Sequence, residues 1–85
     1  MLTVIKMLGH YIKYMRLSRG LTQVELCKMI YIATSTLSHY ETGLRLVPYH
    51  IFLLVAKVCE YEINIIDSKS GQIITDLELS RITKE

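Results

Sequence analysis

Apolar residues recur every three or four positions in four stretches of the chain, which is the spacing of amphipathic helices. The first stretch runs from Leu8 to Leu17, and Gly20 follows it where a helix commonly ends in a left-handed residue. The fourth stretch follows Pro48, a residue suited to a first helical turn. Its predicted buried stripe consists of Ile51, Leu54, Val55 and Val58.

The second stretch begins with the spacing of a capping box, because Glu25 follows Thr22 by three residues and each side chain can satisfy a backbone amide at the helix start. It has the clearest start signal in the sequence. We expect this helix to end near Ile30 and to bury Leu26, Cys27 and Ile30.

The third stretch predicts a helix that begins at Ala33 or Thr34, buries Leu37 and Tyr40, and closes at Gly43. Only residues 31 and 32 separate it from the second helix. Two helices joined by so few residues cannot lie antiparallel, so they must cross at a steep angle around a shared apolar seam.

The pattern changes after residue 60. In "EINIIDSKSGQIITD", β-branched residues lie on both sides of Asp67–Gly71, which predicts a hairpin with a loop of four or five residues. "TDLE" from Thr75 to Glu78 repeats the capping pattern and allows a short terminal helix. We therefore predict an all-α fold with a short C-terminal β-hairpin. The expected units are an N-terminal extension (1–7), a helical domain (8–60) and a hairpin or tail (61–85).

Composition is that of one globular domain, with 85 residues, 51% of them hydrophobic and 21% charged. The net charge is only +2, but residues 1–58 carry seven Lys or Arg against two acidic residues, whereas residues 59–85 carry three against six. The basic part could meet a polyanion, although an ordinary solvated surface is the plainer interpretation.

Several classes of protein are disfavoured. Cys27 and Cys59 lack the nearby Cys or His that a zinc site needs, so we expect buried free thiols and neither metal nor cofactor. The longest uncharged runs, residues 29–40 and 46–56, fall short of the roughly 20 residues of a membrane helix. No secretory signal is visible, so we expect a cytoplasmic protein. No catalytic triad, carboxylate pair or phosphate-cradling loop can be assembled, so an enzyme is not expected.

The segments "GLTQVEL" and "STLSHYETG", together with Arg16, resemble the helix-turn-helix domain of the phage Cro and cI repressor family, also called the XRE type. The resemblance covers roughly residues 8–66. It implies a compact lambda-repressor-like domain of four to five helices. The implied function is a transcriptional regulator, by default a repressor, that binds double-stranded DNA and inserts helix 33–41 into the major groove.

The resemblance also implies which side chains meet the bases. The base-reading residues would be Gln23, Thr34, Ser35, Thr36, Ser38 and His39. Ala33 stands where the family usually has Ser or Thr, so Thr34 or Ser35 is an alternative helix cap. Gln23 can reach a phosphate or an adenine edge, and His39 is either a DNA contact or a solvated surface residue. If His39 approaches phosphate, affinity should rise toward about pH 6.

The implied contacts to the DNA backbone are Thr22, Thr42, the Gly43 amide, Arg45, Lys13 and Arg19. Arg16 and Glu41 would form a partly buried ion pair, whereas the alternative is that Arg16 contacts phosphate directly. Tyr31 departs from the family, which usually places Gly in this turn. Either the turn is remodelled or the tyrosine ring compensates by packing.

The predicted reading face contains no Arg, Lys or Asn, and Gln23 is the only nearby amide. Hydroxyls accept and donate promiscuously, so we expect modest direct readout, with DNA shape, half-site spacing and thymine methyl contacts adding discrimination.

One such module buries too little surface for tight specific binding, so we expect a homodimer. The predicted dimer surface contains Ile63, Ile65, Ile66, Ile73 and Ile74. The alternative is that residues 2–5 fold back over these isoleucines. A different class of function is an antitoxin or protein-interaction module, whose acidic segment Glu60–Glu78 would hold a partner protein.

Overall fold

The computed structural model describes residues 4–75 and residue 81. Residues 4–75 contain four helices and a two-stranded antiparallel hairpin, which confirms the predicted fold class. The elements are α1 (Val4–Ser18), α2 (Gln23–Ile30), α3 (Thr34–Thr42), α4 (Tyr49–Val58), β1 (Ile65–Ile66) and β2 (Ile73–Ile74). The alternative in which residues 2–5 fold back and the possible terminal helix from Thr75 lie largely outside the described residues.

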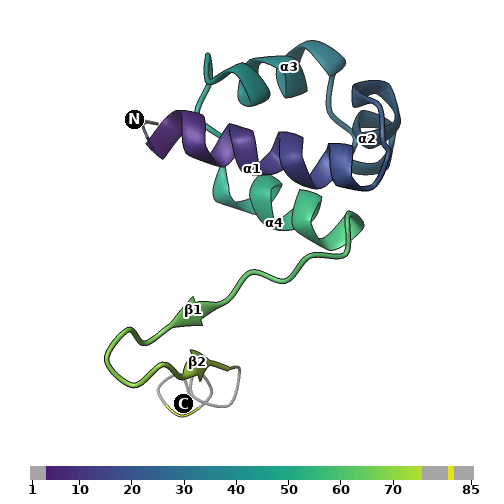
Figure 1. Cartoon of the computed structure of the whole chain (residues 1–85). Coiled ribbons are helices and arrows are strands. Elements are labelled where there is room, and N and C mark those ends of the chain that lie inside the picture. Colours follow the sequence, from purple (N-terminus) through teal and green to yellow (C-terminus); the bar gives the residue numbers. More distant parts are fainter. Residues whose placement is uncertain (1–3, 76–80, 82–85) are drawn as a thin grey trace.

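The helices are arranged around α1, which lies between α3 on one side and α4 on the other (Figure 1). α2 packs against both α3 and α4. The side chains enclosed between the four helices form one core. It consists of Ile12, Met15, Leu26, Cys27, Ile30, Leu37, Tyr40, Val47, Ile51, Phe52, Val55, Ala56 and Cys59. The predicted buried residues of α2 and α3 are all in this core.

The predicted stripe of α4 is partly wrong. Ile51 and Val55 are buried, but Leu54 is 36% exposed, and Phe52 and Ala56 are buried instead. Because residues 51–56 are all apolar, spacing alone could not tell which face of this helix meets the core.

The start of α2 follows its local sequence signal, whereas the start of α1 does not. The Glu25 amide donates to Thr22 Oγ1 at 3.1 Å, and the Thr22 amide donates to Glu25 Oε1 at 2.9 Å, which confirms the capping box. α1 instead begins at Val4, four residues before the predicted start at Leu8, and Gly9 lies inside it. Glycine is required at this position because the Tyr40 carbonyl oxygen of α3 occupies the space of a Cβ.

All four helices are followed by a residue in the left-handed conformation, with φ of 68° at Gly20, 60° at Tyr31, 80° at Gly43 and 62° at Glu60. After each of these residues, the next amide donates back to a carbonyl five residues earlier. The bonds are Leu21 to Arg16, Ile32 to Cys27, Leu44 to His39 and Tyr61 to Ala56, at 2.8 to 3.3 Å. These hydrogen bonds keep the turns after the helices short. The turn at Tyr31 is the one that sets α2 and α3 at an angle.

The Tyr31 turn keeps its left-handed geometry without glycine. The ring is 93% exposed, so neither remodelling nor packing compensates for the Cβ. We therefore expect Tyr31→Gly to raise the free energy of unfolding by about 1 kcal/mol, measured by urea denaturation. Tyr31→Ala is the matched control because it removes the ring but keeps Cβ. An equal gain in both variants would mean that the ring, and not the backbone, is unfavourable.

The segment after Tyr61 leaves the helical body and forms an arm, defined here as residues 62–74 (Figure 1). Ile65 pairs with Ile74 and Ile66 with Ile73, as the predicted hairpin requires. The radius of gyration is 15.0 Å, against about 12 Å for a compact chain of this length. The strand isoleucines are 39–66% exposed. A lone two-stranded hairpin is marginally stable in water and gains stability by packing against another element.

Both cysteines are buried and free, and burial raises the pKa of each thiol. Within residues 4–75 and residue 81, no helix is long and apolar enough to cross a membrane. The same residues contain no group of three or more metal-ligating side chains.

Candidate DNA interface

α3 lies at the edge of the molecule, on the side of α1 opposite to α4 and the arm (Figure 1). Its inner face buries Leu37, Tyr40 and Glu41. Its remaining face presents polar side chains. Thr34, Ser35 and His39 are exposed, and Thr36 and Ser38 are half-buried.

The start of α3 differs from one predicted alternative. Ala33 is the N-cap, and no side chain makes a capping hydrogen bond, so neither Thr34 nor Ser35 caps the helix. Thr34 is already the first residue of the helix, so neither hydroxyl residue occupies the N-cap position, which falls on Ala33. Burial raises the pKa of the Cys27 thiol of α2, and the Thr34 side chain partly offsets this rise. Ser35 therefore remains available on the outer face.

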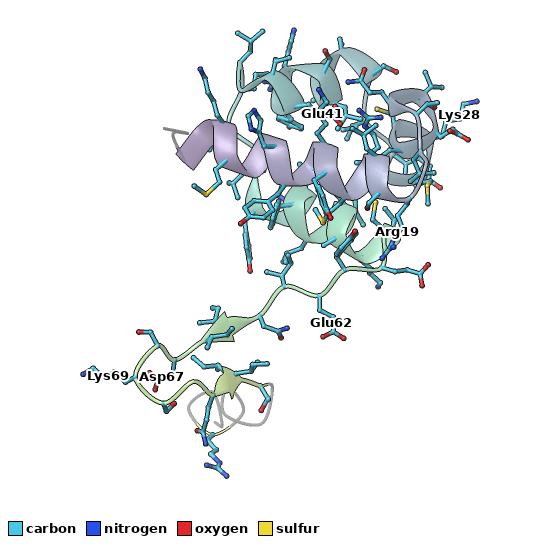
Figure 2. The ribbon with its side chains drawn as sticks, viewed as in Figure 1. Arg19, Lys28, Glu41, Glu62, Asp67 and Lys69 are labelled. Carbon is cyan, nitrogen blue, oxygen red and sulfur yellow. The ribbon has the colours of Figure 1, made fainter. Side chains whose placement is uncertain are left out.

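Arg16 of α1 and Glu41 of α3 form an ion pair that joins α1 to the end of α3. Figure 2 labels Glu41 between these two helices. Arg16 Nε donates to Glu41 Oε2 at 2.7 Å, and Nη2 donates to Oε1 at 2.9 Å. Nη1 donates to the Leu21 carbonyl at 2.8 Å. Arg16 is 7% exposed and Glu41 is 5% exposed. The hydrogen bond to Glu41 raises the pKa of Arg16. With all three of its nitrogens hydrogen-bonded and its side chain buried, Arg16 is a poor candidate for direct phosphate contact.

Gln23 of α2 also binds the Glu41 carboxylate. Its Nε2 donates to Glu41 Oε1 at 3.1 Å. Because an ionised carboxylate only accepts, the amide nitrogen must face Glu41, which fixes the orientation of the amide. One N–H and the carbonyl oxygen of Gln23 remain for other partners. Glu41 therefore fixes the start of α2 and the end of α3 relative to α1.

Two of the predicted DNA-backbone hydroxyls already have partners within the protein. Thr22 is used in the capping box, and Thr42 Oγ1 donates to the Ser38 carbonyl at 2.9 Å. Lys13 and Arg45 are exposed, and Arg45 Cζ lies 5.9 Å from the centroid of the Tyr40 ring.

Two of these predictions are not supported by the geometry. The Gly43 amide donates to the Tyr40 carbonyl at 3.2 Å, because it closes the end of α3, so it is not free to meet a phosphate. Arg19 lies against the end of α4 (Figure 2), where its Nε donates to the Cys59 carbonyl at 2.7 Å. Its guanidinium is therefore directed to the opposite side of the molecule from α3.

Sequence reasoning missed two residues of α1 that support α3. A Cβ at Gly9 would overlap the Tyr40 carbonyl oxygen, so α1 and α3 approach each other through the missing side chain. The aliphatic part of Lys6 lies against Gly43, where an added Cβ would be 2.6 Å from Lys6 Cγ. The signal was present in the spacing, since Lys6, Gly9, Lys13 and Arg16 follow one another at three- and four-residue intervals on one helix face.

Comparison with known proteins gives consistent matches. A family model described as Helix-turn-helix matches residues 12–66. A structure of a HipB variant in an O2 20mer complex matches with a TM-score of 0.63 and 25% identity, covering 80% of this chain and 94% of that one. A HipB–O1–O2 complex matches with a TM-score of 0.62 and 25% identity, covering 79% and 97%. A structure described as "MDT Protein" matches with a TM-score of 0.63 and 25% identity, covering 80% and 96%. No curated protein sequence matches the chain.

Proposed function

The chain belongs to the helix-turn-helix family of the Cro and cI type, and from this premise we propose that it is a transcriptional regulator that binds double-stranded DNA sequence-specifically. The exposed face of α3 carries this proposal. It presents hydroxyls and one imidazole, and the only carboxylate of the helix, Glu41, is buried against Arg16. A face without exposed negative charge can approach phosphates at no repulsive cost.

In the proposed complex, α3 enters the major groove with its N-terminal end first. Thr34, Ser35 and Thr36 then lie nearest the base edges, and Ser38 and His39 lie further along. Gln23, held by Glu41 at 3.1 Å, keeps an oxygen and an N–H for an adenine edge or a phosphate. Thr22, Thr42, Arg45 and Lys13 would contact the DNA backbone, and the aliphatic part of the exposed Lys6 side chain supports the end of α3 at Gly43.

We further propose a homodimer, joined through the arm, that represses transcription by occupying its operator. The arm carries the exposed isoleucines and lies on the other side of the helical body from α3 (Figure 1). Joining two chains through their arms would bury these isoleucines and leave both α3 faces open. Two modules would then meet two half-sites separated by about one DNA turn.

Selection of bound sequences from a random duplex pool tests this function directly. We expect enrichment of two short, symmetric half-sites, with weak preference at several positions because hydroxyls discriminate poorly. A salt series on the enriched duplex should show affinity falling steeply, with a log–log slope of about −0.9 for each phosphate contact. No enrichment at any salt concentration would refute DNA recognition, whereas long and fully specified half-sites would refute modest direct readout.

His39 gives a second, independent expectation. If its imidazole lies near phosphate, DNA favours the protonated form, so affinity should rise by about threefold to tenfold between pH 8 and pH 6. Fluorescence anisotropy at constant ionic strength measures this change. His39→Gln should abolish the rise, while His50→Gln, a change on the exposed start of α4, should retain it. The same pH dependence in wild type and His39→Gln would remove His39 from the interface.

A second candidate is that the arm holds a different protein. Its exposed isoleucines are accompanied by exposed acidic residues, among them Glu60, Glu62 and Asp67. Purification from the native host distinguishes the two arrangements. One stoichiometric partner protein would favour the second candidate, and recovery of the chain alone as a dimer would favour the first.

A further inference from the structure

The direction of the arm is decided at the end of α4. Glu60 adopts a left-handed conformation with φ of 62°, and the chain turns there. The Glu60 amide donates to the Lys57 carbonyl at 3.1 Å, and the Tyr61 amide donates to the Ala56 carbonyl at 2.8 Å. These bonds fix the backbone up to Tyr61 against the last turn of α4.

Arg19, just after α1, holds this turn from the other side. Its Nε donates to the Cys59 carbonyl at 2.7 Å, and its Nη2 lies 3.4 Å from the Glu60 carbonyl. These carbonyls lie beyond the end of α4, where no helical amide is available to them. The guanidinium carbon also lies 4.5 Å from the centroid of the Tyr61 ring, a cation–π distance. Figure 2 shows Arg19 beside the end of α4.

Tyr61 is attached to α1 at a second point. Its hydroxyl lies 2.6 Å from Ser18 Oγ, and Ser18 Oγ donates to the Met15 carbonyl at 2.9 Å. Because a serine hydroxyl has one hydrogen, the Tyr61 hydroxyl must be the donor to Ser18. The ring is therefore held on its face by Arg19 and at its tip by Ser18. We call Ser18, Arg19 and Tyr61 the arm junction.

Beyond Tyr61 every residue of the arm is exposed, and the two strands pair mainly with each other. The point and the direction in which the arm leaves the helical body are therefore set at the arm junction. We infer that Arg19 and Tyr61 are positioning residues, which set the arm angle and thereby the separation of the two α3 helices on DNA. This inference rests on the proposed homodimer joined through the arm.

The link to specificity follows from DNA geometry. Adding one base pair between two half-sites moves one of them along the axis and rotates it by about a tenth of a turn. A dimer with a rigid arm angle can bind both half-sites at only one such spacing. A dimer with a flexible arm junction can bind both half-sites at several spacings, while each α3 contacts its own half-site in the same way.

The test is a selection from duplexes that carry two copies of the enriched half-site with spacers that vary one base pair at a time. Wild type should prefer one spacing over its neighbours by roughly tenfold. Arg19→Ala and Tyr61→Ala should reduce this preference to about twofold, while affinity for an isolated half-site changes less than twofold. Lys28→Ala, which removes the same charge from the exposed face of α2, should keep the wild-type preference. Sedimentation of each variant measures the dimer.

The outcomes separate the two proposals. A wild-type monomer, or a wild type with no spacing preference, would overturn the homodimer and this inference together. A dimeric wild type whose preference survives both substitutions would overturn the inference alone. Dissociation of the variants into monomers would also overturn it, because the junction would then be part of the interface.

Ser18→Ala and Tyr61→Phe, which remove only one hydroxyl each, provide milder variants should either alanine substitution unfold the domain. Each should broaden the preference partially, and an unchanged preference in both would count against the inference.

Discussion

Glu41→Leu should lower the free energy of unfolding by about 3–5 kcal/mol, because it leaves the Arg16 charge buried without its partner. Arg16 is 7% exposed, and Glu41 accepts two of its hydrogen bonds. The leucine cannot replace them, and it also removes the acceptor of Gln23 Nε2. Urea denaturation followed by circular dichroism measures the change. A surface ion pair would give less than about 1 kcal/mol, so the two cases are well separated.

Two further variants make this prediction specific. Glu62→Leu removes a carboxylate from the exposed part of the arm and should change stability by less than about 0.5 kcal/mol. The double variant Arg16→Met/Glu41→Leu removes both charges and should recover most of the loss, because an apolar pair of similar volume fills the site without a buried charge. A loss in Glu41→Leu no larger than that in Glu62→Leu would show that the pair does not hold α1 and α3 together.

Gly9→Ala should cost about 2–4 kcal/mol and weaken DNA binding, because the added Cβ would overlap the Tyr40 carbonyl oxygen. Alanine is otherwise the better helix former by about 1 kcal/mol, so intrinsic propensity predicts a gain. A measured loss of stability in place of this gain would therefore show that α1 packs closely against α3 at Gly9. Thermal unfolding and anisotropy with the selected duplex measure the two effects.

Gly20→Ala is the matched control for this substitution. Its added Cβ meets nothing within 4 Å, although its φ of 68° is unfavourable for alanine. We expect a cost of about 1 kcal/mol from the backbone alone, with DNA affinity unchanged at temperatures where the variant is folded. Equal effects of the two substitutions on DNA affinity would mean that Gly9 does not position α3.

The sequence predicted the helices well because their end signals are local. Thr22 with Glu25 marks the start of α2, and Gly20 and Gly43 mark the ends of α1 and α3. Tyr31 was also correctly singled out as an unusual residue in a left-handed turn. α4 was harder because its apolar residues are contiguous, so Phe52 and Leu54 could be assigned to the core or to the surface only by tertiary packing.

The side-chain partners were less predictable. The resemblance implied the Arg16–Glu41 pair, but nothing in the sequence linked Gln23 to the same carboxylate, because that contact depends on the angle between α2 and α3. Arg19 illustrates the opposite case. The resemblance implied a phosphate contact for it, yet the end of α4, forty residues away in sequence, offers it two carbonyl oxygens and an aromatic ring. Long-range contacts of this kind leave no local pattern.

Entry of α3 into the major groove is tested most directly by Ser35→Glu. Ser35 is exposed in the first turn of α3, where a carboxylate favours the helix, so the fold should be retained. The measurement is the affinity for the selected duplex by anisotropy, with Ser68→Glu in the exposed hairpin loop as the control of equal charge. We predict a loss of about 100-fold or more for Ser35→Glu, because its charge would face bases and phosphates, and less than about threefold for Ser68→Glu. Wild-type affinity in a folded Ser35→Glu protein would contradict the account.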